Sequence, residues 1–243
     1  MALISRQNPL PLYIQLKEVI IEKVEKQVWK PGDTLPTEME LQKMYNVSRT
    51  TVRQALTELV TEGVLERIQG KGTYVAEPKL QPIRPELTGF TQDMSAKGHE
   101  VHSIVLEAEN VECSEKLQRI FNLAPMSKVF KLVRLRLVDN TVIGYHEAFI
   151  NYHLTPHIDF KDYDFAKESL YLTLAKEGIT WGESDETVEA SLAGDAQSKY
   201  LKIPSTAPVL KLSRVTRLQD GRPYEYTNMT YRADRYKYSI KLR

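Results

Sequence analysis

The chain has 243 residues, enough for one large domain or two of modest size. Its 33 lysines and arginines nearly balance its 32 aspartates and glutamates, so the net charge does not indicate a nucleic-acid partner. No stretch approaches the ~20 apolar residues that cross a bilayer, and the N-terminus lacks the apolar segment of a signal peptide. The one cysteine, Cys113, excludes an internal disulfide. We therefore expect a reduced, cytoplasmic protein with no membrane partner.

The first part of the chain has the periodicity of helices. A first helix follows Pro11 and carries an apolar stripe at four-residue spacing, made of Leu12, Leu16, Ile20 and Val24. A second helix begins after Thr37, whose side chain fits a capping box with Glu40, and it ends near Tyr45.

A third helix has the features of a DNA-recognition helix. Ser48 caps its start, it covers residues 49–60, and Gly63 closes it. Its exposed N-terminal end presents four polar side chains, Arg49, Thr50, Arg53 and Gln54. In a helix-turn-helix this end of the second helix meets base edges in the major groove. Arginine can bond guanine there, glutamine can bond adenine, and threonine can touch the thymine methyl.

A short hairpin follows the third helix. Residues 64–68 and 73–75 are two predicted strands, joined by a tip that contains Gly70 and Gly72. Arg67 and Lys71 can contact phosphates or the minor groove from this hairpin. Three helices followed by such a β-wing predict a winged helix-turn-helix over residues 1–76.

Three prolines in eight residues, Pro78, Pro82 and Pro85, separate the two parts of the chain. They prevent a continuous helix and predict an extended linker over residues 77–86. Residues 101–243 read as strands with a few helices between them. We therefore expect a two-domain α+β protein.

The second part contains an internal repeat. Residues 129–134 resemble residues 209–214 at an offset of 80, and each copy continues into a turn pair, Asp139-Asn140 or Asp220-Gly221. Such pairs favour two-residue hairpin turns, because both positions must tolerate positive φ. The pattern predicts two similar antiparallel hairpins in one sheet. A helix over residues 168–177, stopped by Gly178, lies between them.

Two arginines on a predicted strand are candidates for binding an anion. Arg134 and Arg136 are two residues apart and project from the same face, whereas Val133, Leu135 and Leu137 cover the other. Parallel guanidinium groups can grip a phosphate, sulfate or carboxylate. The alternative is a structural role, in cross-strand salt bridges that could involve Glu225.

Residues 89–94 open a short helix whose N-terminus carries the Thr91 hydroxyl. Such a terminus can bind an anion. The alternative is an ordinary helix start.

The first part of the chain resembles the DNA-binding domain of the GntR family of bacterial regulators. The resemblance covers nearly all of residues 9–76 and rests on the motifs at residues 35–38, 47–56 and 69–73. One departure is Met39, which stands where many members carry a base-reading arginine. The expected DNA contacts are Thr37, Glu38, Ser48, Arg49, Thr50, Thr51, Arg53, Gln54, Arg67, Gly70, Lys71 and Gly72.

The second part resembles the effector domain of the HutC subfamily, called UTRA, which is similar in fold to chorismate lyase. The resemblance spans most of residues 83–240 and rests on residues 87–94, 134–137, 169–171 and 231–236. It is closest to repressors of amino-sugar use that sense glucosamine-6-phosphate or N-acetylglucosamine-6-phosphate. It implies a winged helix-turn-helix joined to a UTRA antiparallel-sheet domain over residues 87–243.

The resemblance also implies an effector pocket. The phosphate would be held by Phe90, Thr91, Arg134, Ser169 and Tyr171. The sugar would be bonded by Arg136, Glu225 and Tyr231. A second departure is His146, which stands where the subfamily usually has a glutamate, with Glu147 beside it on the opposite face. This histidine could change the effector.

An enzyme is the main rival class, because a lyase-like fold can be catalytic. The sequence has no nucleophile elbow and no phosphate-binding Gly-Lys-Ser/Thr motif. His99 and His102, or His153 and His157, have spacings that could bind a metal, although both pairs are better explained as surface histidines. We expect no metal, no cofactor and no catalytic residue.

We predict a homodimeric regulator, a repressor, that binds a pseudo-palindromic double-stranded operator and is controlled by a small anionic effector. A purely architectural DNA-binding protein would not need a second domain of this size. The alternative for the second domain is a different carboxylate or sugar phosphate as effector, or retained lyase-like activity.

Overall fold

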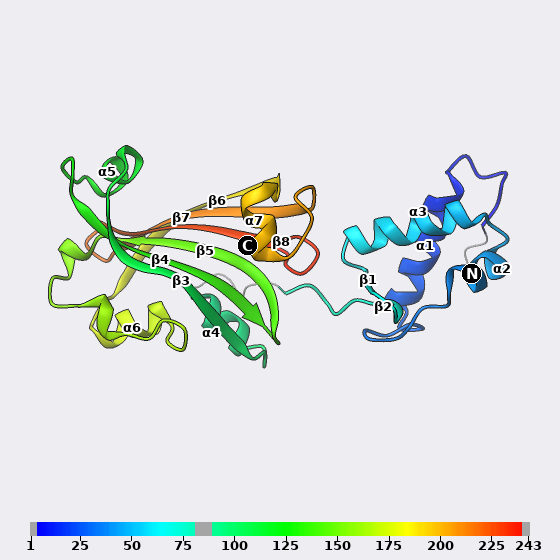
Figure 1. Cartoon of the computed structure of the whole chain (residues 1–243), viewed down its shortest axis with the longest axis horizontal. Helices are drawn as coiled ribbons and strands as arrows, with labels where there is room; N and C mark the ends of the chain where they lie inside the picture. The colour runs from blue at the N-terminus through cyan, green and yellow to red at the C-terminus, as the bar shows by residue number, and fades with distance from the viewer. Residues whose placement is uncertain (1–3, 81–88, 240–243) are drawn as a thin grey trace. The chain divides into compact units, whose positions relative to one another are not determined.

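The computed structural model describes residues 4–80 and 89–239. The chain divides into two compact units, the first made of the residues up to Lys79 with Ala233–Arg235 and the second of the rest, and each unit is described by itself (Figure 1). Most of the predicted linker at 77–86, and the motif residues Leu87 and Thr88, lie outside the described residues. The domain limits 1–76, 77–86 and 87–243 therefore stay predictions.

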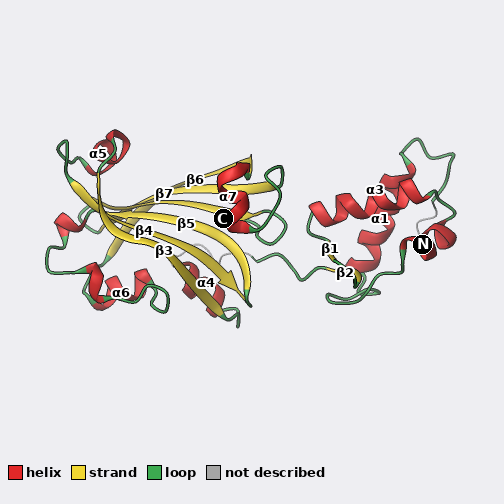
Figure 2. Ribbon diagram, viewed as in Figure 1, coloured by secondary structure: helices red, strands yellow, loops and turns green. Residues whose placement is uncertain are grey.

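The first unit has three helices and a two-stranded hairpin, as the sequence predicts (Figure 2). The elements are α1 (Leu12–Glu25), α2 (Glu38–Tyr45), α3 (Arg49–Thr61), β1 (Leu65–Ile68) and β2 (Gly72–Val75). Their apolar faces meet in one core whose most buried members include Leu16, Ile20, Leu41, Leu56 and Leu59. Burial of these faces, rather than helix propensity, supplies most of the stability of such short helices.

Both predicted N-caps are present. The Thr37 hydroxyl accepts from the amide of Glu40, and the Glu40 carboxylate accepts from the amide of Thr37. The Ser48 hydroxyl accepts from the amide of Thr51 at 3.1 Å. Between the two helices, Asn46 adopts a left-handed conformation with φ of 52°, which ends α2 and turns the chain into α3. Local side-chain chemistry thus sets the turn of the helix-turn-helix.

The second unit is built on six antiparallel strands in the order β3-β4-β5-β8-β7-β6. The strands are β3 (Val101–Glu112), β4 (Lys128–Val138), β5 (Thr141–Ile150), β6 (Trp181–Leu192), β7 (Pro208–Leu218) and β8 (Pro223–Arg232). The helices are α4 (Phe90–Ser95), α5 (Glu115–Phe121), α6 (Leu170–Lys176) and α7 (Gly194–Leu201), with 3-10 turns η1 (Tyr152–Leu154) and η2 (Phe160–Asp162).

The internal repeat extends beyond the hairpins that the sequence predicts. A strand, a helix and a hairpin occur twice, as β3-α5-β4-β5 and β6-α7-β7-β8. The first strands of the two copies, β3 and β6, begin 80 residues apart, at Val101 and Trp181. The second strands, β4 and β7, also begin 80 residues apart, at Lys128 and Pro208. The two copies join through the β5–β8 pairing at the centre of the sheet. The prediction of two similar hairpins in one sheet is confirmed.

The two hairpin turns differ from each other. Asp139 and Asn140 have φ of 48° and 64°, as a two-residue turn with both positions at positive φ requires. At the second hairpin Gly221 has positive φ and Asp220 does not. There the amide of Leu218 donates to the carbonyl of Arg222, which closes a three-residue loop. The predicted two-residue turn is wrong at this hairpin, because one residue more separates the strands.

Helices cover both faces of the sheet. In Figure 1, α4 and α6 lie on one side of it, and α5 and α7 lie on the other. Leu170 and Leu174 of α6 pack on Phe130 and Leu132, whereas Leu117 and Phe121 of α5 pack with Val129 on the opposite face. Residues that alternate along β4 therefore enter different cores. Among the described residues, no helix is long and apolar enough to cross a membrane.

Candidate DNA-binding surface and effector pocket

The N-terminal end of α3 is exposed, as a recognition helix requires. The side chains of Arg49 and Arg53 are 69% and 59% exposed. Thr50 and Gln54 are exposed as well. These residues lie at one helix end because Ser48 caps the helix, which then begins at Arg49. Their role in base contact stays a prediction.

Glu38 brings three of the predicted DNA-binding arginines together. Its carboxylate lies 3.4 Å from Nε of Arg49, 3.4 Å from Nε of Arg53 and 3.7 Å from Nη2 of Arg67. These arginines belong to α3 and to β1, so one acidic side chain of α2 connects the helices with the wing. Neighbouring Met39 is 63% exposed. Its side chain presents an apolar surface beside these arginines.

The wing tip has the conformation that its glycines favour. Gly70 and Gly72 have φ of 76° and 126°, values that side chains rarely allow. Ile68 pairs with Gly72, and the amide of Lys71 donates to the carbonyl of Ile68, so the tip is a tight turn. Lys71 is exposed at this tip, as a contact with a phosphate requires.

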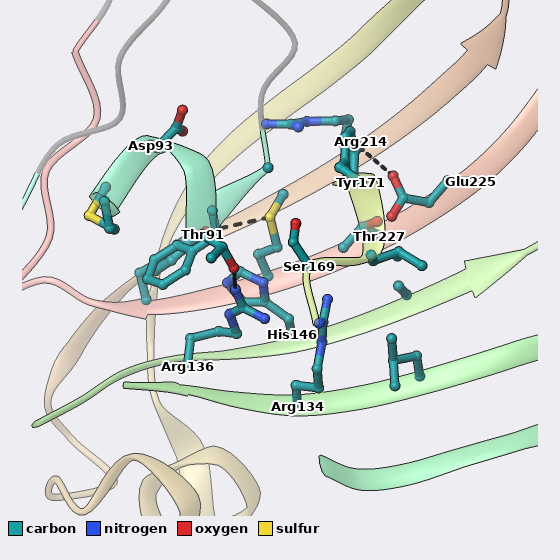
Figure 3. A pocket seen from close by; sticks show the side chains of 18 of the residues that line it. Thr91, Asp93, Arg134, Arg136, His146, Ser169, Tyr171, Arg214, Glu225 and Thr227 are labelled. Carbon is teal, nitrogen blue, oxygen red and sulfur yellow. Dashed lines mark hydrogen bonds between the residues drawn. The ribbon is translucent and has the colours of Figure 1, made fainter. Parts of the chain in front are cut away.

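All nine predicted effector residues line one cavity of about 50 Å³ in the second unit (Figure 3). The cavity lies on the sheet face that α4 and α6 cover. The nine residues come from α4, β4, β5, the start of α6, and β8. They are Phe90, Thr91, Arg134, Arg136, His146, Ser169, Tyr171, Glu225 and Tyr231. Their role in binding an effector stays a prediction.

Strand register places the pocket side chains in rows. Arg134 lies opposite His146, which lies opposite Met229 on the next strand. Two residues along β4, Arg136 lies opposite Gly144, which lies opposite Tyr231. Both arginines therefore face the same side of the sheet, as their spacing predicts.

The two arginines are buried and incompletely hydrogen-bonded. Nη2 of Arg136 donates to the Thr91 hydroxyl at 2.5 Å, but its Nε and Nη1, and Nη1 of Arg134, have no partner among the described residues. Burial and the neighbouring Arg136 lower the pKa of Arg134 well below its usual value, and burial lowers that of Arg136 to about 10. Within the described residues neither arginine pairs with Glu225, so the predicted alternative of a salt bridge there is not observed.

Glu225 is bound by hydroxyl groups instead. Its Oε2 accepts from the phenol of Tyr171 at 2.5 Å and from Thr216 at 3.3 Å. Burial, followed by the charge of Glu225, raises the pKa of Tyr171, so the phenol stays protonated and donates. This end of the cavity presents a carboxylate and a phenol, which suit the hydroxyl groups of a ligand.

Arg214 also lines the cavity, and the sequence analysis missed it. It lies on β7 and pairs with Glu186 of β6 through two contacts of 2.6 and 2.7 Å. A signal was present, because Arg214 is the counterpart of Arg134 at the repeat offset of 80. Two further polar lining residues that were missed are Asp93 and Thr227, the latter buried with an unpartnered hydroxyl.

The two helices whose N-termini border the cavity, α4 and α6, are too short to bind an anion by their N-termini alone. α4 has six residues, and its Thr91 hydroxyl already accepts from Arg136. Ser169 caps α6 by accepting from the amide of Leu172. Among the described residues no group of three or more histidine, cysteine, aspartate or glutamate side chains could hold a metal ion. His99 pairs with Asp139 and His102 with Glu100, both as exposed or half-exposed side chains.

Two family models match the chain. The model described as bacterial regulatory proteins, gntR family, matches residues 12–75, and the UTRA domain model matches residues 96–237.

Two transcriptional repressors are among the proteins to which the chain is similar. The HTH-type transcriptional repressor NagR of Bacillus subtilis (strain 168) is 31% identical over 97% of this chain and 96% of that protein. The mannosyl-D-glycerate transport/metabolism system repressor MngR of Escherichia coli (strain K12) is 32% identical over 95% of each chain. The crystal structure of PhnF from Mycobacterium smegmatis has the same fold, with a TM-score of 0.66 and 24% identity over 95% of this chain and 98% of that one.

Proposed function

Because the chain belongs to the GntR family of bacterial regulatory proteins and carries a UTRA domain, we propose that it represses transcription until a small anionic metabolite binds. The family is one of DNA-binding regulators and not of enzymes. The observation that carries the proposal is the pair of buried arginines in the cavity of the second unit, with guanidinium nitrogens that lack partners.

Unpaired buried charge is costly, so these arginines need a partner to be stable. Leaving a charged donor buried without an acceptor costs more than a lost neutral hydrogen bond. An anion that accepts from Arg134 and Arg136 offsets this cost with charge-assisted hydrogen bonds. The Thr91 and Ser169 hydroxyls border the same space and can donate to the same anion.

The metabolite is expected to be a phosphorylated sugar, such as glucosamine-6-phosphate or N-acetylglucosamine-6-phosphate. Its phosphate would lie against Arg134 and Arg136, and its hydroxyls would lie toward Glu225 and Tyr171. The resemblance implies the reverse roles for Arg136 and Tyr171, and the unpartnered nitrogens of both arginines favour the arrangement proposed here. A sugar-linked carboxylate is the second candidate, because one relative is named for mannosyl-D-glycerate, a carboxylate. A carboxylate can also accept from two guanidinium groups.

Binding would change the conformation of the second unit. The cavity of about 50 Å³ has room for a few water molecules, so a sugar phosphate must displace lining side chains. One contact that an anion would replace is the bond from Arg136 to Thr91, which joins β4 to α4. In a homodimer that places two α3 helices in successive major grooves, a state favoured by the effector would no longer match the operator.

Thermal melts test the proposal. Purified protein is melted with glucosamine-6-phosphate, N-acetylglucosamine-6-phosphate, glycerate and the unphosphorylated sugars. A ligand at 100 times its dissociation constant stabilises the folded state by about 2.7 kcal/mol. We expect a shift with a phosphorylated sugar and none with its parent sugar. The same ligand should then release the protein from operator DNA selected from a random pool.

A matched pair of arginine variants locates the binding site. Arg134→Met removes one buried guanidinium at similar volume, a replacement that cores tolerate, and should abolish the shift. Arg222→Met removes an exposed arginine at the hairpin turn and should leave it unchanged. A shift that persists in Arg134→Met, or no shift with any anion, would overturn the anionic effector.

A further inference from the structure

The imidazole of His146 is held rigidly at the anion end of the cavity. Its ring lies between those of Phe90 and Tyr231, at centroid distances of 5.4 and 5.0 Å, both edge to face. The side chain is buried, and Nε2 has no hydrogen-bond partner among the described residues. Arg134 is its direct neighbour across the strands. An imidazole nitrogen thus faces the same space as the two arginines (Figure 3).

The charges around His146 do not balance a dianion. Arg214 is neutralised by Glu186. Arg134 and Arg136 then face one carboxylate, Glu225, so this cluster carries one net positive charge.

The remaining titratable groups around the cavity add no positive charge. Asp93 of α4 lines the cavity with an interaction of its own, and its carboxylate, where ionised, only enlarges the negative excess that a dianion creates. The tyrosines are neutral, and Glu147, next to His146 on β5, lies on the opposite face with Lys131. These groups come from every element around the cavity, and those that share it with His146 are Asp93, Arg134, Arg136, Tyr171, Arg214, Glu225, Tyr231 and Tyr236.

We propose that His146 takes up a proton when a dianion binds beside Arg134 and Arg136, so that effector binding is coupled to proton uptake. The inference rests on the proposed function, since it concerns the same pocket. A bound dianion would leave the buried cluster with one net negative charge. Protonated His146 would donate a hydrogen bond to the anion, and its positive charge would neutralise the cluster. A monoanion would leave the cluster neutral, and the histidine would then stay uncharged.

The pH dependence follows from the two states of His146. Without a bound anion, burial of His146 lowers its pKa well below the usual value, and the charges of Arg136, Arg134 and Arg214 lower it further. The ring is therefore neutral at neutral pH. A bound dianion raises that pKa. The affinity for a dianion therefore grows as pH falls below the bound-state pKa, and it decreases as pH rises toward it. At the steepest point the change is tenfold per pH unit.

Two anions that share a tetrahedral sulfate group but differ in charge test the coupling. Inorganic sulfate is a dianion and methyl sulfate is a monoanion, and neither titrates between pH 5.5 and 8.5. Calorimetric titrations of the full chain should give a sulfate affinity that decreases with rising pH, by up to tenfold per unit. The methyl sulfate affinity should be constant. In buffers of different ionisation enthalpy, sulfate alone should show proton uptake.

Two histidine variants assign the proton. His146→Gln should bind both anions with no pH dependence, whereas His157→Gln, at an exposed position, should behave as the parent chain does. Sulfate binding that is flat with pH, or a slope that persists in His146→Gln, would overturn the inference and leave the effector site intact. If neither anion binds, the effector site fails and this inference with it. Should His146→Gln not fold, the difference in proton uptake between the two anions decides.

Discussion

In the first unit, three arginines that are predicted to contact DNA gather around one carboxylate. The arginines that gather at Glu38 are more than 40% exposed, and exposed ion pairs contribute little to stability. Their value is positional, because Glu38 directs side chains of α3 and β1 to one surface. DNA phosphates and bases can replace this one carboxylate at small cost, whereas the arginines alone would repel one another.

Base-reading and phosphate-contacting residues should respond differently to truncation. Arg53→Ala removes a predicted base contact and should abolish specific operator binding while the fold survives, because each bidentate pair contributes about 1–3 kcal/mol of discrimination. Arg49→Ala should behave the same way. Lys71→Ala removes a predicted phosphate contact and should reduce the salt dependence of binding by about one unit of slope.

Fluorescence anisotropy on a selected operator, repeated over a series of salt concentrations, measures both effects. Lys26→Ala, which truncates an exposed lysine at the end of α1, is the control and should change neither quantity. Unchanged affinity in Arg49→Ala or Arg53→Ala would refute the role of that residue in recognition.

At the scale of elements, duplication explains the form of the pocket. The strand–helix–hairpin unit occurs twice, and its two copies meet at β5 and β8. Equivalent positions of the copies therefore face each other across the sheet, so Arg134 and its counterpart Arg214 both border the cavity. They differ in their partners, because Arg214 has Glu186 and Arg134 has no ion-pair partner among the described residues. One copy thus supplies unneutralised charge for an anion, while the other is internally paired.

The start of α3 is an element whose stability can be measured separately. Ser48→Ala removes the side chain that accepts from the Thr51 amide and should destabilise the first unit by about 1 kcal/mol. Ser48→Thr keeps a capping hydroxyl and should lose much less. The chain has two tryptophans, Trp29 in the first unit and Trp181 in the second.

In a Trp181→Phe background, urea unfolding followed by Trp29 fluorescence reports on the first unit alone. An equal midpoint for Ser48→Ala and the parent would show that the cap contributes nothing to this helix.

For the whole molecule, the proposed regulation depends on a homodimer. We expect a homodimer in solution, because paired recognition helices match a pseudo-palindromic operator with half-sites about one helical turn apart. Light scattering at micromolar concentration should give twice the chain mass of 28.0 kDa. Selected operators should contain two inverted half-sites. A monomer under these conditions would contradict the mechanism.

The sequence alone determined the elements whose signals are local. The Ser48 cap, the Thr37–Glu40 capping box, the glycine tip of the wing and the Arg134–Arg136 spacing all act within a few residues, so pattern and chemistry predict them. The three helices and the wing follow from these local signals, whereas the UTRA fold was implied by the family resemblance, and both are confirmed. The short helices α5 and α7 were not predicted individually, because so few residues show no clear periodicity. The edge strand β6 was not predicted individually, because it is mostly exposed and lacks an alternating apolar pattern.

Tertiary structure decided which distant side chains share a cavity and which charges remain unpaired. Arg214 was missed because its place in the cavity depends on the β7–β8 register. The pairing of Glu225 with Tyr171, rather than with Arg134, depends on where α6 packs. The lack of a hydrogen-bond partner for His146 Nε2 among the described residues likewise depends on which residues of other elements surround it. Burial raises the free-energy cost of an unpaired charge. Because burial depends on how the whole molecule packs, a short stretch of sequence cannot predict it.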